Sequence, residues 1–149
     1  MKLSKNFTLA EIEHSSTAKR LGINNEMPKE HIANMQRLIT ELIQPMRDAL
    51  GPIRISSGYR SPKLNKAIGG SSRSQHCKGE ALDLQFWKEG KMNNKVIYDW
   101  VIDSGIEFDQ MINEFDNAWI HISLKSKENR KEILEAYKNE KGKTKYKYV

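Results

Sequence analysis

The chain has 149 residues, a formal net charge of +6, 38% hydrophobic residues and one cysteine. This length suits one domain with a short appendage, and a single cysteine excludes both an internal disulfide framework and a multi-cysteine zinc finger. No apolar run approaches the roughly 18 residues of a membrane span, so no stable membrane insertion is expected.

The N-terminal part of the chain is predicted to be helical. Thr8, followed three residues later by Glu11, forms a capping box that begins a short helix. Apolar residues then recur at three- and four-residue spacing over Ile32–Leu50, which indicates one buried helical face. Pro45 should kink this helix near its end, and Gly51 should help to end it.

The middle of the chain is predicted to hold two strands separated by a long loop. Ile53–Ser56 is the first strand, and Ala81–Phe86 is the second, with apolar residues on one face and Asp83 on the other. Between them, Ser57–Lys78 is rich in Gly, Ser, Asn and Lys, with one helical turn expected at Pro62–Ala67. Loops of this length in a small domain are usually functional or disordered.

The C-terminal part is predicted to contain a helix, a hairpin and a final helix. Lys95–Ser104 has helical spacing, whereas Phe108–Phe115 and Trp119–Leu124 alternate as strands around the turn Asp116-Asn117. Lys127–Glu140 is expected to be an amphipathic helix with Ile133, Leu134 and Tyr137 inward. The order of elements predicts an α+β fold in which helices pack on a small antiparallel sheet.

The charge is concentrated at the C-terminal end. Residues 125–149 hold nine basic and four acidic residues, a net of +5, whereas residues 1–124 have a net of +1. We therefore divide the chain into a body, 1–124, and a basic C-terminal helix and tail, 125–149. Such a tail either binds an anionic polymer of a bacterial envelope or is a solvated helix with a frayed end. The near-neutral body and the lack of a nucleic-acid motif argue against a nucleic-acid partner.

Three potential metal ligands are predicted to share one face of the sheet. Asp83 and His121 lie opposite the apolar residues of their strands, and His76 precedes Asp83 by seven residues at the exit of the long loop. Each histidine taken singly is more often a surface or core residue. Together, two histidines and a carboxylate suit a catalytic zinc site, which uses three protein ligands and leaves a fourth position for water.

Two further residues would complete a hydrolase. If Asp116-Asn117 is a two-residue turn, Glu114 pairs with Trp119 and shares the face of His121. Glu114 is then a candidate general base that deprotonates the attacking water and protonates the leaving amine, unless it is a solvent-facing carboxylate. Arg60 offers a planar fork of donors for a substrate carboxylate or a polarised carbonyl, or else braces the loop.

Three segments resemble the motifs of one enzyme family, in that family's order. Ser74–Asp83 is similar to the S-x-H-x-x-G-x-A-x-D zinc motif of the D-Ala-D-Ala carboxypeptidase family, metallopeptidase family M15. Trp119–Ser123 resembles its W-x-H-x-S motif, and Ser57–Ser61 resembles its substrate-binding S-G-Y-R-S segment. The resemblance covers roughly Phe7 to Leu124, and three motifs together are far more specific than one.

The resemblance implies a fold, a cofactor and a substrate. The fold is the one shared with the zinc-binding signalling domain of Hedgehog proteins, a small antiparallel sheet with helices on one side. The cofactor is one zinc ion, Zn2+, with His76, Asp83 and His121 as its ligands. The substrate is the stem peptide of bacterial peptidoglycan, with its D-amino acids.

The resemblance also implies roles for the residues around the metal. Glu114 would be the base, Arg60 the substrate clamp, and Ser74 would form a supporting hydrogen bond near the site. Tyr59, in the S-G-Y-R-S segment, and Trp119, on the face of His121, are further candidates for substrate binding. Packing under the loop is the other interpretation of Tyr59.

The position of the base differs among branches of the family. Several branches carry the catalytic acid three residues before the second histidine, where this chain has Ala118. Glu114, seven residues before His121, matches branches with a longer hairpin turn, and Asp116 is the alternative base.

The sequence thus predicts a zinc-dependent, monomeric peptidase of peptidoglycan. It would remove the terminal D-Ala of the stem or cut within it, for example between L-Ala and D-Glu. Met1–Asn6 contains no apolar signal-peptide region, so we expect synthesis in the cytoplasm and action on the cell wall, as for a phage or prophage endolysin. The alternative is a wall-binding module that keeps zinc without hydrolysis, and the presence of Glu114 favours an enzyme.

Overall fold

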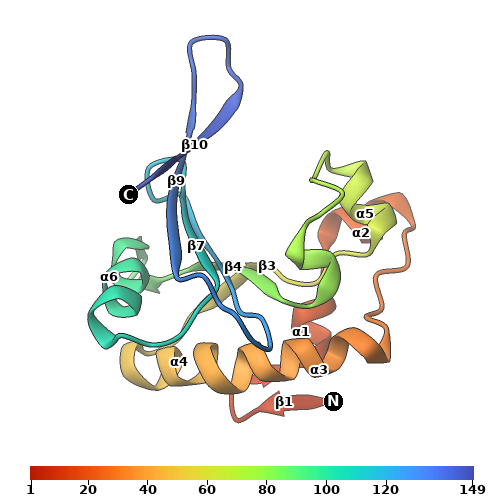
Figure 1. Cartoon of the computed structure of the whole chain (residues 1–149). Coiled ribbons are helices and arrows are strands. Elements are labelled where there is room, and N and C mark those ends of the chain that lie inside the picture. Colours follow the sequence, from red (N-terminus) through yellow and green to blue (C-terminus); the bar gives the residue numbers. More distant parts are fainter.

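A nearly continuous run of helix forms the base of the computed structural model, which describes residues 1–149 (Figure 1). The run consists of α3 (Lys29–Leu38), a π-helical turn η1 (Ile39–Ile43) and α4 (Gln44–Leu50). Its apolar face is buried, as the spacing predicted. Directly before Pro45 the helix widens, because the N–H of Gln44 bonds the carbonyl of Ile39 five residues back.

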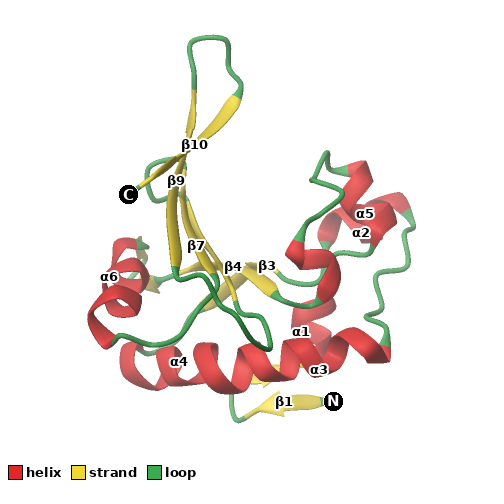
Figure 2. Cartoon of the chain, viewed as in Figure 1, coloured by secondary structure: helices red, strands yellow, loops and turns green.

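Six strands form one sheet above this base, in the order β10-β9-β7-β8-β4-β3 (Figure 2). Their bounds are β3 Arg54–Ser57, β4 Ala81–Gln85, β7 Gln110–Glu114, β8 Trp119–Ser123, β9 Glu132–Lys138 and β10 Thr144–Tyr148. All neighbours are antiparallel except β7 and β9, which are parallel. The predicted α+β class is confirmed, and the sheet is mixed because of β9.

The core lies between the helical base and one face of the sheet. Alternation along β4 and β8 sends Leu82, Leu84, Ile120 and Ile122 into this core, where all four are fully buried. The same alternation leaves the polar residues of these strands on the opposite face. That face carries the candidate site.

Short elements complete the fold. They are α1 (Leu9–Glu13), α2 (Ser16–Leu21), α5 (Pro62–Ala67), a 3₁₀ turn η2 (Gln75–Lys78), α6 (Lys95–Ser104), and the strand pairs β1 (Lys2–Ser4) with β2 (Phe7–Thr8) and β5 (Trp87–Lys88) with β6 (Lys91–Met92). The capping box is present, since the Thr8 hydroxyl accepts a hydrogen bond from the N–H of Glu11 at 3.3 Å. None of the helices combines the length and apolarity needed to span a bilayer.

The C-terminal segment corrects one expectation, because the amphipathic helix predicted at Lys127–Glu140 is wrong. Its residues form β9, and the chain then returns as β10, so that the two strands project as a hairpin from the sheet (Figure 1). Leu134 and Ala136 are buried on the face away from the helical base, whereas Ile133 packs against the main core. Tyr137, expected to point inward, is 41% exposed. Parallel pairing with β7 extends the sheet by β9, which places Ile133 against the main core and Leu134 and Ala136 beside Ile112 on the other face.

Candidate metal centre

The polar face of the sheet forms the floor of a cleft of about 760 Å³. Residues paired across neighbouring strands share a face, and the register pairs Asp83 with His121 and Glu114 with Trp119. All four line the cleft, together with His76 and Arg60. The hairpin register expected from the sequence is confirmed, although the turn spans Phe115–Ala118, with the N–H of Ala118 bonding the Glu114 carbonyl at 2.9 Å.

His76 reaches the cleft from the short turn η2 rather than from a strand. The Ser74 hydroxyl caps this turn by accepting a hydrogen bond from the N–H of His76 at 3.2 Å. Gly79 ends it with a φ of 72°, in the left-handed region that favours glycine. A Cβ at Gly79 would also lie 2.5 Å from the backbone oxygen of His31, so the motif glycine lets the loop pass close to α3.

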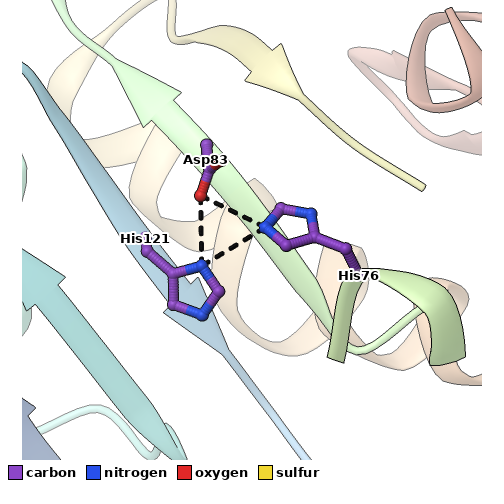
Figure 3. A group of neighbouring side chains, drawn as sticks. All are labelled: His76, Asp83 and His121. Atoms are coloured by element: carbon purple, nitrogen blue, oxygen red, sulfur yellow. Dashed lines mark hydrogen bonds and ion pairs between the residues drawn. The ribbon is translucent and has the colours of Figure 1, made fainter. Parts of the chain in front are cut away.

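Three atoms from His76, Asp83 and His121 meet at the centre of the cleft (Figure 3). The Asp83 Oδ1 atom lies 3.2 Å from His76 Nε2 and 3.1 Å from His121 Nδ1, and the two nitrogens are 3.3 Å apart. Zinc bonds of roughly 2.0–2.1 Å at tetrahedral angles separate their ligand atoms by about 3.3 Å. The triangle therefore has the size of one face of a tetrahedral zinc site.

The hydrogen bonding of His76 also suits a metal ligand. Its Nδ1 atom lies 2.8 Å from the carbonyl oxygen of Gly58, which can only accept, so Nδ1 carries the proton and Nε2 presents a lone pair. This lone pair faces the Asp83 Oδ1 atom and the Nδ1 atom of His121. A cation bound between the three atoms would remove the repulsion between their lone pairs. The donor set and its geometry thus fit zinc, with His76, Asp83 and His121 to hold it.

Arg60 contacts Asp83, the carboxylate of the triangle. Its Nη2 atom lies 3.1 Å from Asp83 Oδ2, and its Nε donates to the Ser57 hydroxyl at 3.1 Å. Burial alone would raise the pKa of Asp83, but without a metal the two histidines, when protonated, outweigh it and hold that pKa well below its usual range. Asp83 is therefore ionised, with one oxygen toward the histidines and one toward Arg60.

Glu114 lies on the cleft face of β7 and is 9% exposed. Burial raises the pKa of its carboxyl to about 7, and the Asp83 charge adds to this, while His121 and Arg60 act in the opposite direction. A carboxyl with a pKa near neutrality can both accept and return a proton. Asp116, the alternative base, is exposed in the turn and does not line the cleft.

The remaining predicted residues are divided between the cleft and the core. Trp119 lines the cleft beside Glu114, and Ser74 lies at its rim. Tyr59 is 2% exposed, packs in the main core and does not line the cleft, although it borders a second cavity of about 330 Å³. The structure therefore brings together every predicted site residue except Tyr59 and the alternative base Asp116.

Sequence reasoning missed one wall of the cleft. This wall is the β9–β10 hairpin, which contributes Leu134, Lys138, Thr144 and Tyr146. The available signal was the alternation of Thr144–Tyr148 after the turn-forming Asn139 and Gly142. This signal was overlooked because the preceding residues, Lys127–Glu140, were predicted to be a helix.

Comparisons with known proteins agree with the architecture of the site. The family model described as Peptidase M15 matches residues 5–123. A zinc D-Ala-D-Ala carboxypeptidase from Streptomyces albus G is 42% identical over 50 residues, which is 32% of this chain and 20% of that relative. The similarity to this relative is thus confined to about a fifth of its length. The family match covers most of the chain, including all three cleft ligands, and this chain belongs to the peptidase M15 family.

Proposed function

We propose that this protein is a zinc-dependent peptidase that hydrolyses the stem peptides of bacterial peptidoglycan. The observation that carries the proposal is the His76, Asp83 and His121 triangle, with Glu114 on the same face of the cleft. Family membership supports peptidase chemistry, and the carboxypeptidase relative supports a substrate with D-amino acids.

Each side chain has a role that follows from its contacts. The chemistry that zinc supplies when bound is a lowered pKa for water and a polarised substrate carbonyl. Glu114 accepts the proton of the attacking water and returns it to the leaving amine, which a pKa of about 7 permits in both directions. Its buried position on the strand limits competing contacts with solvent.

Arg60 orients both the metal site and the substrate. Its Nη2 and Nε atoms are engaged by Asp83 and Ser57, whereas Nη1 has no partner within the protein. This free donor is available to a substrate carbonyl or carboxylate. Trp119 provides an apolar wall beside Glu114 for a substrate side chain.

The bond that is cut distinguishes two activities. A carboxypeptidase releases the terminal D-Ala, whereas an endopeptidase cuts within the stem, for example between L-Ala and D-Glu. We include the second activity because the basic C-terminal segment, with a net charge of +5, suits action on an anionic cell wall, as in a phage endolysin.

Mass spectrometry of purified peptidoglycan digested with the zinc-loaded protein tests this proposal. Loss of terminal D-Ala identifies a carboxypeptidase, and a new amino terminus within the stem identifies an endopeptidase. A parallel digest with a chelator is the control. The absence of any chelator-sensitive product from walls of different types would overturn the proposal in favour of a zinc-containing wall-binding module.

A further inference from the structure

The β9–β10 hairpin lies outside the segment that the family model matches, yet it forms a wall of the cleft. The match ends at residue 123, and β9 begins at Glu132. Leu134, Lys138, Thr144 and Tyr146 of the hairpin line the same cavity as the metal triangle. This wall is therefore a feature of the chain that the family's motifs do not explain.

The register across the strands shows how the wall is arranged. Glu114 pairs with Ala136, and Ala136 pairs with Tyr146, so these residues form one row on the cleft face. Lys138 pairs with Thr144 in the next row, beyond the end of β7. Sheet spacings of roughly 3.3 Å per residue and 4.8 Å per strand put the Cα of Lys138 about 8 Å from that of Glu114.

Lys138 is held in place but has no acidic partner. Its Nζ atom donates to the Thr144 hydroxyl at 2.7 Å and lies 5.0 Å from the centre of the Phe115 ring. The ring of Phe115 in turn packs edge-on against Trp119, with centroids 5.5 Å apart. The ammonium group of this exposed side chain thus lies at one end of the cleft, and no carboxylate is paired with it.

The other cations of the cleft differ from Lys138. Arg60 is paired with Asp83, and Arg130 is paired with Asp109. Arg73 lies in the loop of the opposite wall, and its side chain forms no hydrogen bond or ion pair. Among these cations, Lys138 alone combines a side-chain hydrogen bond within the hairpin with an unpaired charge.

We propose that Lys138 is a substrate-binding residue that pairs with a carboxylate of the stem peptide at the end of the cleft beyond Glu114. The proposal rests on the proposed function and specifies the substrate further. At about 3.3–3.6 Å per extended residue, a Cα separation of about 8 Å, together with the reach of the two side chains, places this carboxylate within a few residues of the cleaved bond. Tyr146, in the row between Lys138 and the metal triangle, forms the wall along which that part of the peptide lies.

The stem peptide offers two carboxylates of this kind, and three peptides distinguish them. The first carries a γ-linked D-Glu residue with a free α-carboxylate and a free C-terminal carboxylate, the second has a C-terminal amide, and the third has D-isoglutamine, the α-amide, in place of D-Glu. Calorimetry measures the Kd of each peptide for the zinc-loaded, full-length Glu114→Gln protein, which we expect to turn over substrate at least about 10²-fold more slowly. The same measurement is repeated with Lys138→Gln added.

Lys145→Gln is the matched control. Lys145 lies on the same hairpin and loses the same charge, but it alternates with Thr144 and Tyr146 and does not line the cleft. Thermal unfolding verifies that both variants fold.

The proposal predicts that Lys138→Gln weakens binding of the first peptide about fivefold, the effect of a partly exposed ion pair. Lys138→Gln leaves the Kd unchanged for the one peptide that lacks the carboxylate paired with Lys138. Lys145→Gln changes the Kd of none of the three peptides. Equal weakening of all three peptides, no weakening, or no binding of any peptide would overturn the proposal. Carboxylate-dependent binding through Lys138 without hydrolysis of any wall would instead overturn the proposed function and leave the subsite in place.

Discussion

Glu114 is the residue whose surroundings are best matched to acid–base chemistry. It lies in the cleft next to the metal triangle, and burial raises its pKa to about 7. The same burial limits contact of its carboxyl with solvent. Its proton is therefore available for transfer to and from a substrate.

Replacing Glu114 with Gln removes this proton acceptor while preserving the shape of the side chain. We expect hydrolysis to fall by about 10²- to 10⁴-fold, the range of a lost general base, with zinc still bound. Initial rates and metal content measured on the same preparation check both parts. Asp116→Asn is the matched control and should keep full activity, so a larger loss in Asp116→Asn would reverse the assignment of the base.

Gly58 is the second residue on which the site depends. Its carbonyl accepts from His76 Nδ1, and a Cβ at this position would lie 2.2 Å from the backbone oxygen of Ile12. That oxygen already accepts the N–H of Tyr59 at 2.9 Å, so the backbone has no room to move without losing a hydrogen bond.

Gly58→Ala should therefore weaken zinc binding and lower the free energy of unfolding by about 2 kcal/mol, as overpacking does. Competition with a coloured chelator measures the first effect, and denaturant unfolding measures the second. Gly90→Ala has open space but strains a φ of 76°, so it should lower stability at a turn away from the cleft and leave zinc affinity unchanged. Wild-type zinc affinity in Gly58→Ala would show that the Gly58 carbonyl does not orient His76.

At the level of elements, Asp109 fastens the C-terminal hairpin to the body. It is fully buried and accepts hydrogen bonds from Arg130, just before β9, and from Gln75, next to the candidate ligand His76. Burial alone would raise its pKa, but the hydrogen bonds and charge of Arg130 lower it to about 2. One buried carboxylate thus joins β9, β7 and the metal-binding turn.

This lowered pKa makes part of the stability depend on pH. A carboxyl whose pKa falls from 3.8 to about 2 on folding stabilises the fold above pH 3.8 and loses that effect as the pH falls toward 2. The difference corresponds to at most about 2 kcal/mol. Asp109→Asn should lower the free energy of unfolding by up to this amount at pH 7, and its difference from the wild type should shrink below pH 4.

Thermal or denaturant unfolding between pH 7 and pH 2 measures this difference. Glu128→Gln is the control, since Glu128 is an exposed acid of the same loop without an ion pair. A constant difference between Asp109→Asn and the wild type across this range would show that the ion pair does not stabilise the fold.

The elements also show what the sequence could predict. Local signals were sufficient where the periodicity was strong, as in α5, α6 and the β7–β8 hairpin, and two-residue alternation put Asp83, Glu114 and His121 on one face. The β9–β10 hairpin was missed because the adjacent apolar residues Ile133 and Leu134 fit two structures equally well. These are one buried face of a helix and a strand with apolar contacts on both faces. Its parallel pairing with β7 is a long-range contact that no local pattern reveals.

On the scale of the whole molecule, the cleft lies between two walls that both carry basic residues. One wall is the loop that carries Arg60 and Arg73, and the other is the basic hairpin. The opposite face of the sheet packs on the helical base, which fixes the floor between these walls (Figure 1). We propose that the exposed lysines of the hairpin also attract the molecule to an anionic cell wall.

Three of these lysines lie at or near the turn of the hairpin and have no acidic partner, namely Lys141, Lys143 and Lys145. Replacing all three with Gln should weaken pelleting with purified cell walls at low salt, where long-range attraction is least screened. At 0.1 M salt this attraction is screened within about 10 Å, so the effect of the replacement should shrink. Cleavage of a short soluble peptide should not change. Unchanged wall binding at every salt concentration would show that these lysines of the hairpin do not attract the protein to the cell wall.

The measurement that tests the account most directly is zinc removal and replacement in one preparation. The protein is stripped with a chelator, zinc is added back in steps, and bound metal and peptidoglycan hydrolysis are followed together. We predict that hydrolysis is absent in the stripped protein and returns in proportion to zinc, up to one ion per chain, and that Asp83→Ala does not recover. Hydrolysis that persists without metal, or full zinc loading without any hydrolysis, would contradict the account.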